Sequence, residues 1–184
     1  SITGTHGKTT TTSLLISMFL KNKIDINAIV GTNIEILDNK NYKTGSSNIF
    51  ILETCEFNSG FLDLEPEILA ITNIELDHFD SFSNLEDYIE IFQKLAENTK
   101  EKIIVNAKDK NSEKLEHKNK IYFNTGTLPE LDNLIGEFNQ QNADCALKIA
   151  NELKLNEKVS RLAAKEFNGI QKRMELINDN IYAD

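Results

Sequence analysis

The residues that could do chemistry are concentrated at the beginning of the chain, which reads Gly4-Thr5-His6-Gly7-Lys8-Thr9-Thr10. In a loop of this kind, backbone N–H groups and the N-terminus of the following helix hold phosphate oxygens. A lysine reaches the terminal phosphates, and a threonine hydroxyl can ligate Mg²⁺. The spacing is a tight variant of the usual motif, because Ile2 stands where a full Walker A sequence would have its first glycine. We predict a phosphate-binding loop in which Lys8 contacts phosphate and Thr9 contacts the metal. A glycine turn that opens an ordinary helix is disfavoured, because the threonine run that follows is poor helix-forming sequence.

A carboxylate, Glu53, follows the apolar run at residues 49–52. Nucleotide-hydrolysing enzymes commonly place an acidic residue, more often Asp, at the end of a neighbouring strand, where it holds Mg²⁺ directly or through water. We predict that Glu53 and Thr9 hold one Mg²⁺. From local sequence alone, an exposed carboxylate at a sheet edge is the alternative. Glu56, three positions further on, is interpreted as supporting this site or facing a substrate.

A second polar segment follows the apolar run at residues 68–71 and contains Asp77, His78 and Asp80. Its expected place near the loop suggests a second metal site with His78 as a ligand. A histidine with a purely structural role is the alternative. Cys55 is not a candidate nucleophile, because the flanking carboxylates disfavour the thiolate.

The spacing of apolar residues predicts strands that alternate with helices, which is typical of an α/β domain. An amphipathic helix is expected from Lys8 to about Leu20. We expect a mostly parallel sheet with helices on both faces, P-loop NTPase-like, in which the loop, Glu53 and His78 converge at the carboxyl ends of the strands. The other expected elements are strands at 26–30 (closed by Gly31), 49–52, 68–71, 102–105 and 121–123, helices at 85–97, 139–153 and 157–167, a loop or hairpin at 38–48, and a charged, exposed helix or loop at 108–120.

Length and charge narrow the possible function classes. The 184 residues carry a formal net charge of −9 and are 40% hydrophobic, which suits one domain with a substantial core. The acidic balance argues against non-specific nucleic-acid binding and against a basic membrane-surface patch, and no apolar run approaches the ~18 residues of a membrane-spanning helix. We expect no nucleic-acid or membrane partner, and a cytoplasmic location with Cys55 and Cys145 as free thiols. The chain starts inside the strand that feeds the loop and ends without turn or tail chemistry, so we also expect a domain cut from a longer protein.

Taken together, these segments resemble the Mur ligases, the ATP-dependent amide-bond-forming enzymes of peptidoglycan synthesis. The His6-containing loop is most similar to the branch that adds L-alanine to UDP-N-acetylmuramate. The stretches at 53–62 and 72–78 are similar to the next two motifs of that branch. The stretch at 136–143 resembles the family's adenine-binding motif, and 167–175 resembles the motif that closes its central domain. The resemblance covers essentially the whole chain, and implies that residues 1–184 are a central ATP-binding domain without its N-terminal UDP-binding and C-terminal domains.

The resemblance also implies roles for single residues. Gly4 to Thr10 would bind the triphosphate of ATP, and Lys8, Glu53 and His78 would be catalytic, the last two as Mg²⁺ ligands. Two positions depart from the family: Phe138 replaces the usual histidine, which leaves at most stacking on adenine, and Lys172 stands where arginine is common, which weakens a bidentate contact. The remaining implied contacts are Asn139 and Asn142 with adenine, and Arg173 with the ATP phosphates or ribose.

The implied reaction passes through an acyl phosphate. The muramoyl carboxylate attacks the γ-phosphate, Lys8 and the metals stabilise the charge on the transferred group, and the alanine amine then displaces phosphate. The isolated domain is expected to bind ATP–Mg²⁺ weakly and to lack ligase activity. Three alternatives remain open: a recycling ligase that joins UDP-N-acetylmuramate to a preformed tripeptide, a folylpolyglutamate-synthase-like ligase, which His6 and the Asp77-His78 pair disfavour, and a nucleotide-binding regulatory module.

Overall fold

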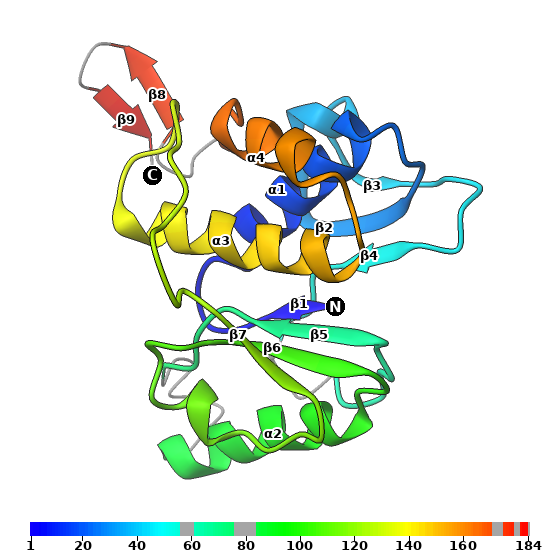
Figure 1. Ribbon diagram of the computed structural model, residues 1–184, viewed down its shortest axis with the longest axis vertical. Helices are drawn as coiled ribbons and strands as arrows, with labels where there is room; N and C mark the ends of the chain where they lie inside the picture. Colours follow the sequence, from blue (N-terminus) through cyan, green and yellow to red (C-terminus); the bar gives the residue numbers. More distant parts are fainter. Residues whose placement is uncertain (56–60, 76–83, 171–174, 179–180, 184) are drawn as a thin grey trace.

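The computed structural model describes residues 1–55, 61–75, 84–170, 175–178 and 181–183, with side chains up to residue 170. Its centre is a parallel sheet in the strand order β1-β5-β6-β7 (Figure 1). A second sheet, in the order β3-β2-β4, meets the edge of the first: Ile2 forms a parallel bridge with Glu53, and Thr54 N donates to Ile2 O at 2.8 Å. The strands are β1 (Ile2–Thr3), β2 (Asn27–Ile34), β3 (Lys40–Lys43), β4 (Phe50–Leu52), β5 (Ile68–Ile71), β6 (Lys102–Asn106) and β7 (Lys120–Phe123).

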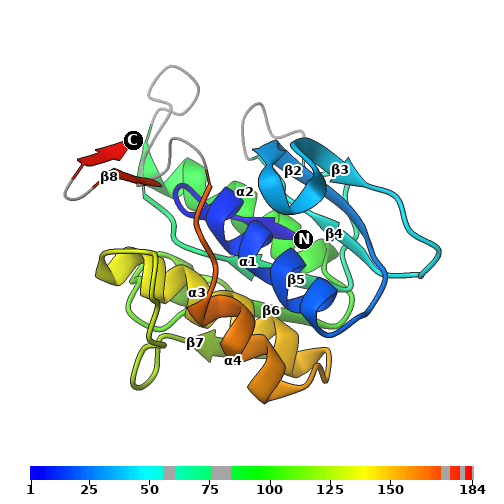
Figure 2. The same cartoon turned by 90° about the horizontal axis from the view of Figure 1, so that it is seen from above.

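Helices cover both faces of the central sheet, as predicted. Helix α2 (Leu85–Asn98) lies on one face, while α1 (Lys8–Lys21), α3 (Glu137–Glu152) and α4 (Glu157–Lys165) lie on the other (Figures 1 and 2). Successive strand residues point to opposite faces, so neighbours enter different cores. Ile103 packs in the core under α2, whereas Ile104 belongs to the core of the other face. This two-sided burial explains why the central strands read as continuous apolar runs.

Helix α2 is amphipathic, as its sequence predicted. Tyr88, Phe92 and Leu95 are buried against the sheet, and the Tyr88 and Phe92 rings meet edge to face with centroids 5.2 Å apart. The helix begins after Asn84, whose side-chain oxygen accepts a hydrogen bond from Asp87 N at 2.8 Å. Such a cap satisfies one of the amide groups that the first turn leaves without an intrahelical acceptor.

Helix α1 begins at Lys8 as predicted, but the prediction that it is amphipathic was wrong. All residues from Thr11 to Phe19 are buried. Helices α3 and α4 both pack against α1 on this face of the sheet, and α3 also contacts β6 and β7 (Figure 2). Small hydroxyl residues on this helix, such as Ser13 and Ser17, are buried as well.

Several element boundaries differ from the prediction. Strand β2 continues past Gly31 to Ile34, and β3 pairs antiparallel with it, so the predicted loop or hairpin at 38–48 contains a hairpin strand. The segment at 108–120 is a loop with one short 3-10 turn at Ser112–Lys114, in which Ser112 is buried rather than exposed. Helix α4 ends at Lys165, before the predicted end at residue 167. A short 3-10 turn, η1 (Glu35–Leu37), and an antiparallel pair, β8 (Glu175–Asn178) with β9 (Ile181–Ala183), were not predicted.

Both cysteines are free thiols, as predicted. Cys55 is exposed, and Cys145 is buried inside α3, where burial raises the pKa of its thiol. Among the described residues, no helix is both long enough and apolar enough to cross a membrane.

Candidate functional site

The predicted phosphate loop connects β1 to α1 and depends on two glycines. Gly7 has a φ of 81°, in the left-handed region, and Gly4 has a φ of 130°. A Cβ on Gly7 would overlap the side-chain oxygen of Asn142, and a Cβ on Gly4 would overlap the hydroxyl of Thr72. Glycine is therefore required for two reasons, the backbone conformation and the close approach of neighbouring side chains.

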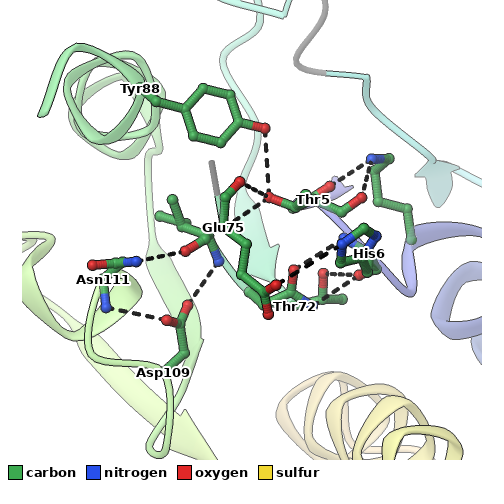
Figure 3. Close-up of polar contacts among 11 residues, drawn as sticks. Thr5, His6, Thr72, Glu75, Tyr88, Asp109 and Asn111 are labelled. Carbon is green, nitrogen blue, oxygen red and sulfur yellow. Dashed lines mark hydrogen bonds and ion pairs between the residues drawn. The ribbon is translucent and has the colours of Figure 1, made fainter. Parts of the chain in front are cut away.

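Hydrogen bonds from the end of β5 hold this loop in place (Figure 3). Thr5 N donates to Asn73 O at 3.0 Å, and His6 N donates to the Asn73 side-chain oxygen, also at 3.0 Å. The carbonyl of His6 accepts hydrogen bonds from the Thr72 hydroxyl at 2.6 Å and from Asn73 Nδ2 at 3.1 Å. Thr72 and Asn73 directly follow the strand predicted at residues 68–71, but they were not predicted as site residues.

Lys8 brings a positive charge to the loop. Lys8 Nζ donates to the carbonyls of Gly4 at 2.5 Å and Thr5 at 3.1 Å, so its ammonium group lies over the loop. Helix α1 has no acidic residue in its first turn, and Thr11 N donates to Gly7 O. The N-terminus of a helix carries a partial positive charge and favours anions. This end of α1 therefore has the electrostatics of an anion site.

Glu53 lies beside the first turn of α1, next to Thr9, with which it was predicted to hold Mg²⁺. Its Oε1 accepts a hydrogen bond from the Thr9 hydroxyl at 2.7 Å, and its Oε2 accepts one from Gly31 N at 2.7 Å. A carboxylate and a hydroxyl are hard oxygen donors, which Mg²⁺ prefers. Among the described residues, no group of three or more His, Cys, Asp or Glu side chains could hold a metal ion. The Thr9 hydroxyl and the Glu53 carboxylate are therefore a pair of donors and not a complete ligand set.

A cavity of about 480 Å³ lies beside the loop and extends toward α3. Phe138, at the start of α3, is 52% exposed, whereas Asn139 is buried and donates through Nδ2 to Ile135 O at 2.7 Å. Phe123 and Gln141 were not predicted as site residues; Phe123 is the last residue of β7, at the carboxyl end of that strand. The cavity is lined by His6, Gly7, Thr10, Thr72, Asn73, Phe123, Phe138, Asn139, Gln141 and Asn142.

A second cavity, of about 410 Å³, lies at the other end of the sheet, where β1, β4 and β5 begin. It is mainly apolar, and Phe50 and Pro66 are among its lining residues. None of the predicted site residues lines it. The predicted chemistry therefore belongs to the cavity at the carboxyl ends of the strands.

The Thr5 hydroxyl links the loop to the segment that follows β5 (Figure 3). Thr5 Oγ1 accepts from Glu75 N and donates to Glu75 O, both at 2.9 Å, and lies 3.5 Å from the hydroxyl of Tyr88. From the opposite side, Ile74 N donates to Asp109 Oδ2 at 2.8 Å. The exposed side chains of His6 and Glu75 are 4.0 Å apart, and an ion pair in such a solvated position contributes little to stability.

Some predicted residues lie outside the described part of the chain. These include the predicted metal ligand His78 with its neighbours Asp77 and Asp80, and also Glu56, Lys172 and Arg173. The structure brings together Gly4 to Thr10, Glu53, Asn139 and Asn142 around the loop and its cavity. The roles of all these residues in binding remain predictions.

Comparison with known proteins agrees with this architecture. Residues 2–127 match the Mur ligase middle domain. The UDP-N-acetylmuramate–L-alanine ligase of Borreliella burgdorferi is 40% identical over 112 residues, which are 60% of this chain and 24% of that protein. The enzyme of the same name from Clostridium botulinum (strain Kyoto) is 47% identical over 94 residues, 51% of this chain and 20% of that protein. The chain thus spans about a quarter or less of these relatives.

Solved structures show the same fold. The UDP-N-acetylmuramate-alanine ligase of Thermotoga maritima superposes with a TM-score of 0.81 at 21% identity, covering 97% of this chain and 47% of that one. A bifunctional folylpolyglutamate synthase/dihydrofolate synthase from Yersinia pestis, complexed with AMPPNP and a manganese ion, gives a TM-score of 0.65 at 16% identity, covering 97% and 59%. Because residues 2–127, more than half of the chain, match the Mur ligase middle domain, the chain belongs to the Mur ligase family.

Proposed function

We propose that this chain is the ATP-binding domain of a longer, ADP-forming ligase that joins L-alanine to UDP-N-acetylmuramate in peptidoglycan synthesis. The observation that carries the proposal is the grouping of Lys8, Thr9 and Glu53 at a glycine loop that opens a helix. The relatives that are 40% and 47% identical bear the name of this activity. Because the chain spans only part of those relatives, the substrates and the remaining domains would belong to the longer protein, which we place in the cytoplasm.

The residues at the loop fit ATP and Mg²⁺. Without side chains at Gly4 and Gly7, the loop can approach phosphate closely, and the N-terminus of α1 favours the negative charge. In the proposal, Gly4 to Thr10 hold the triphosphate, and Thr9 and Glu53 hold Mg²⁺. Bound Mg²⁺ supplies charge neutralisation on the phosphate oxygens. The Yersinia pestis neighbour, which shares the fold, was solved with AMPPNP and manganese, and this supports the same ligand class.

Lys8 would change partners when nucleotide binds. Its ammonium group now donates to two loop carbonyls, those of Gly4 and Thr5. A phosphate oxygen is a stronger acceptor for an ammonium group than a neutral carbonyl, because the hydrogen bond is then charge-assisted on both sides. Lys8 would thus stabilise the charge on the phosphoryl group that is transferred.

The cavity beside the loop has the composition of a base site. Phe138 offers a half-exposed ring for stacking, and Phe123 adds a second apolar surface. Asn139 already uses its Nδ2 on Ile135 O, so its side-chain oxygen is the atom we assign to adenine, together with the amide of Asn142. Arg173 and His78 keep their predicted roles, at the ATP phosphates or ribose and at a second metal, as part of the proposal.

The proposed chemistry requires no protein nucleophile. Phosphoryl transfer from ATP to the carboxylate of UDP-N-acetylmuramate makes an acyl phosphate and releases ADP, and attack by the alanine amine then forms the amide and releases phosphate. The chain's own residues contribute positioning and electrostatic stabilisation, which are the main protein contributions to phosphoryl transfer.

The test is phosphate release from ATP by the longer protein that contains this domain, with UDP-N-acetylmuramate as acceptor. We expect L-alanine to stimulate release, and the Lys8→Ala variant to lose it. Stimulation by a preformed muropeptide tripeptide but not by alanine would replace the proposed substrate with that of a recycling ligase. Acceptor-independent hydrolysis alone would favour a regulatory nucleotide-binding module.

A further inference from the structure

Gly31 lies in the middle of β2, facing the carboxylate of Glu53. A Cβ placed on Gly31 would be 2.7 Å from Glu53 Oε1, 3.1 Å from Cδ and 3.3 Å from Oε2. The first of these separations is closer than real Cβ atoms come to other heavy atoms. The carboxylate therefore occupies the space that any side chain at position 31 would fill.

The backbone of β2 does not itself require glycine here. Gly31 is not among the glycines with a positive φ, so alanine can adopt its conformation. Glycine inside a strand weakens the strand, and it often marks a place where another group approaches closely. The approaching group at this position is the Glu53 side chain.

The same carboxylate is held at both of its oxygens. Gly31 N donates to Oε2, and the Thr9 hydroxyl donates to Oε1, each at 2.7 Å. A glutamate side chain has three rotatable bonds, and restricting them costs conformational entropy. A charge-assisted hydrogen bond from the Gly31 amide offsets part of that cost and favours one direction of the other oxygen.

We propose that Gly31 is a positioning residue of the metal site, which directs the Glu53 carboxylate toward Thr9 through its N–H group and through its lack of a side chain. This inference rests on the proposed function, because it assigns the aligned oxygens to Mg²⁺. It predicts that Gly31 affects the metal-dependent part of nucleotide binding and leaves the phosphate loop itself intact.

The experiment measures the ATP affinity of the 184-residue chain by calorimetry, with Mg²⁺ and with EDTA. The ratio of the two affinities is the magnesium gain. Loss of a residue that orients a metal ligand typically costs about 10–100-fold in metal affinity. We expect the ATP affinity of Gly31→Ala in EDTA to stay within about twofold of the wild-type value. Its magnesium gain should be about tenfold smaller than that of the wild type, and Glu53→Gln should show the same reduction. Gly126→Ala is the matched control, because a Cβ at Gly126 meets nothing within 4 Å.

Combining the variants separates action through Glu53 from a general effect. In the Glu53→Gln background, Gly31→Ala should reduce the magnesium gain no further. A smaller magnesium gain in the double variant than in Glu53→Gln would overturn the inference and leave the proposed function standing. A magnesium gain of Gly31→Ala equal to that of the wild type would do the same. A wild-type chain without any magnesium gain would overturn both.

If Gly31→Ala prevents folding, unfolding measurements decide the matter. Gly31→Ala combined with Glu53→Ala should fold, since the overlapping carboxylate is then removed. If this double variant also fails to fold, Gly31 is needed for a reason other than the Glu53 carboxylate, and the inference is overturned.

Discussion

Replacing Gly7 with alanine should destabilise the chain by about 2–5 kcal/mol. A left-handed φ, here 81°, costs a residue with a Cβ about 1–2 kcal/mol. The new methyl group would also lie 3.0 Å from Asn142 Cγ and overlap the neighbouring oxygen, and overpacking of a buried site costs about 1–3 kcal/mol. Asn142 is 8% exposed on α3, so it has little room to move away.

Urea unfolding followed by circular dichroism measures this effect. Gly126→Ala, at a position with no atoms near the added Cβ, should stay within about 0.5 kcal/mol of the wild type. In an Asn142→Ala background the overlap disappears and the φ strain remains, so Gly7→Ala should then cost only about 1–2 kcal/mol. A Gly7→Ala chain as stable as the Gly126→Ala control would refute both the backbone and the packing argument.

Two further predictions concern other polar contacts. Thr5→Val keeps the side-chain shape but removes the hydroxyl that bonds both backbone groups of Glu75, so it should cost about 1–3 kcal/mol of unfolding free energy. The exposed Thr127→Val is its control, and equal urea midpoints for the two variants would argue against a stabilising role of the Thr5 hydroxyl. Hydrogen bonds from the Ser46 backbone and side chain lower the pKa of Asp25 from 3.8 to about 2. Because the folded pKa lies below the unfolded one, this stabilisation is present above pH 4 and is lost as the pH falls toward 2. The difference in unfolding free energy between wild type and Asp25→Asn should therefore shrink over that range, and a pH-independent difference would contradict the assignment.

The sequence predicted strands best where both faces of the strand are buried. The run at 68–71 became β5 with the same bounds, because a parallel strand covered on both faces is continuously apolar. In contrast, β3 could not be told from a loop, since an exposed edge strand of polar residues has no burial pattern. Strand β2 was expected to stop at Gly31, but the glycine there accommodates the approach of Glu53 and does not end the strand.

Burial by other helices was beyond the reach of the local pattern. The spacing of Leu14, Leu15, Met18 and Phe19 is that of an amphipathic helix, yet α1 also packs against α3 and α4, and every residue from Thr11 to Phe19 is buried. The periodicity of one helix carries no information on how many neighbours surround it.

Of the candidate site, the sequence predicted the part that follows from topology. The ends of parallel strands meet at one edge of a sheet, which brought the loop and Glu53 together. The support of the loop by Thr72 and Asn73 could not be predicted, because it depends on the exact register of β5 against β1. The lining of the cavity by Phe123 depends in the same way on where α3 lies relative to β7.

We propose that the glycine loop of this chain binds ATP with Mg²⁺. Calorimetry of the 184-residue chain with ATP and Mg²⁺, beside the variant Lys8→Met, measures this binding. We predict weak but saturable binding by the wild type, and a loss of about tenfold or more in the variant, because a charged hydrogen-bond donor to phosphate is removed. Absence of binding at millimolar ATP, or equal binding by both proteins, would show that the loop is not an ATP site.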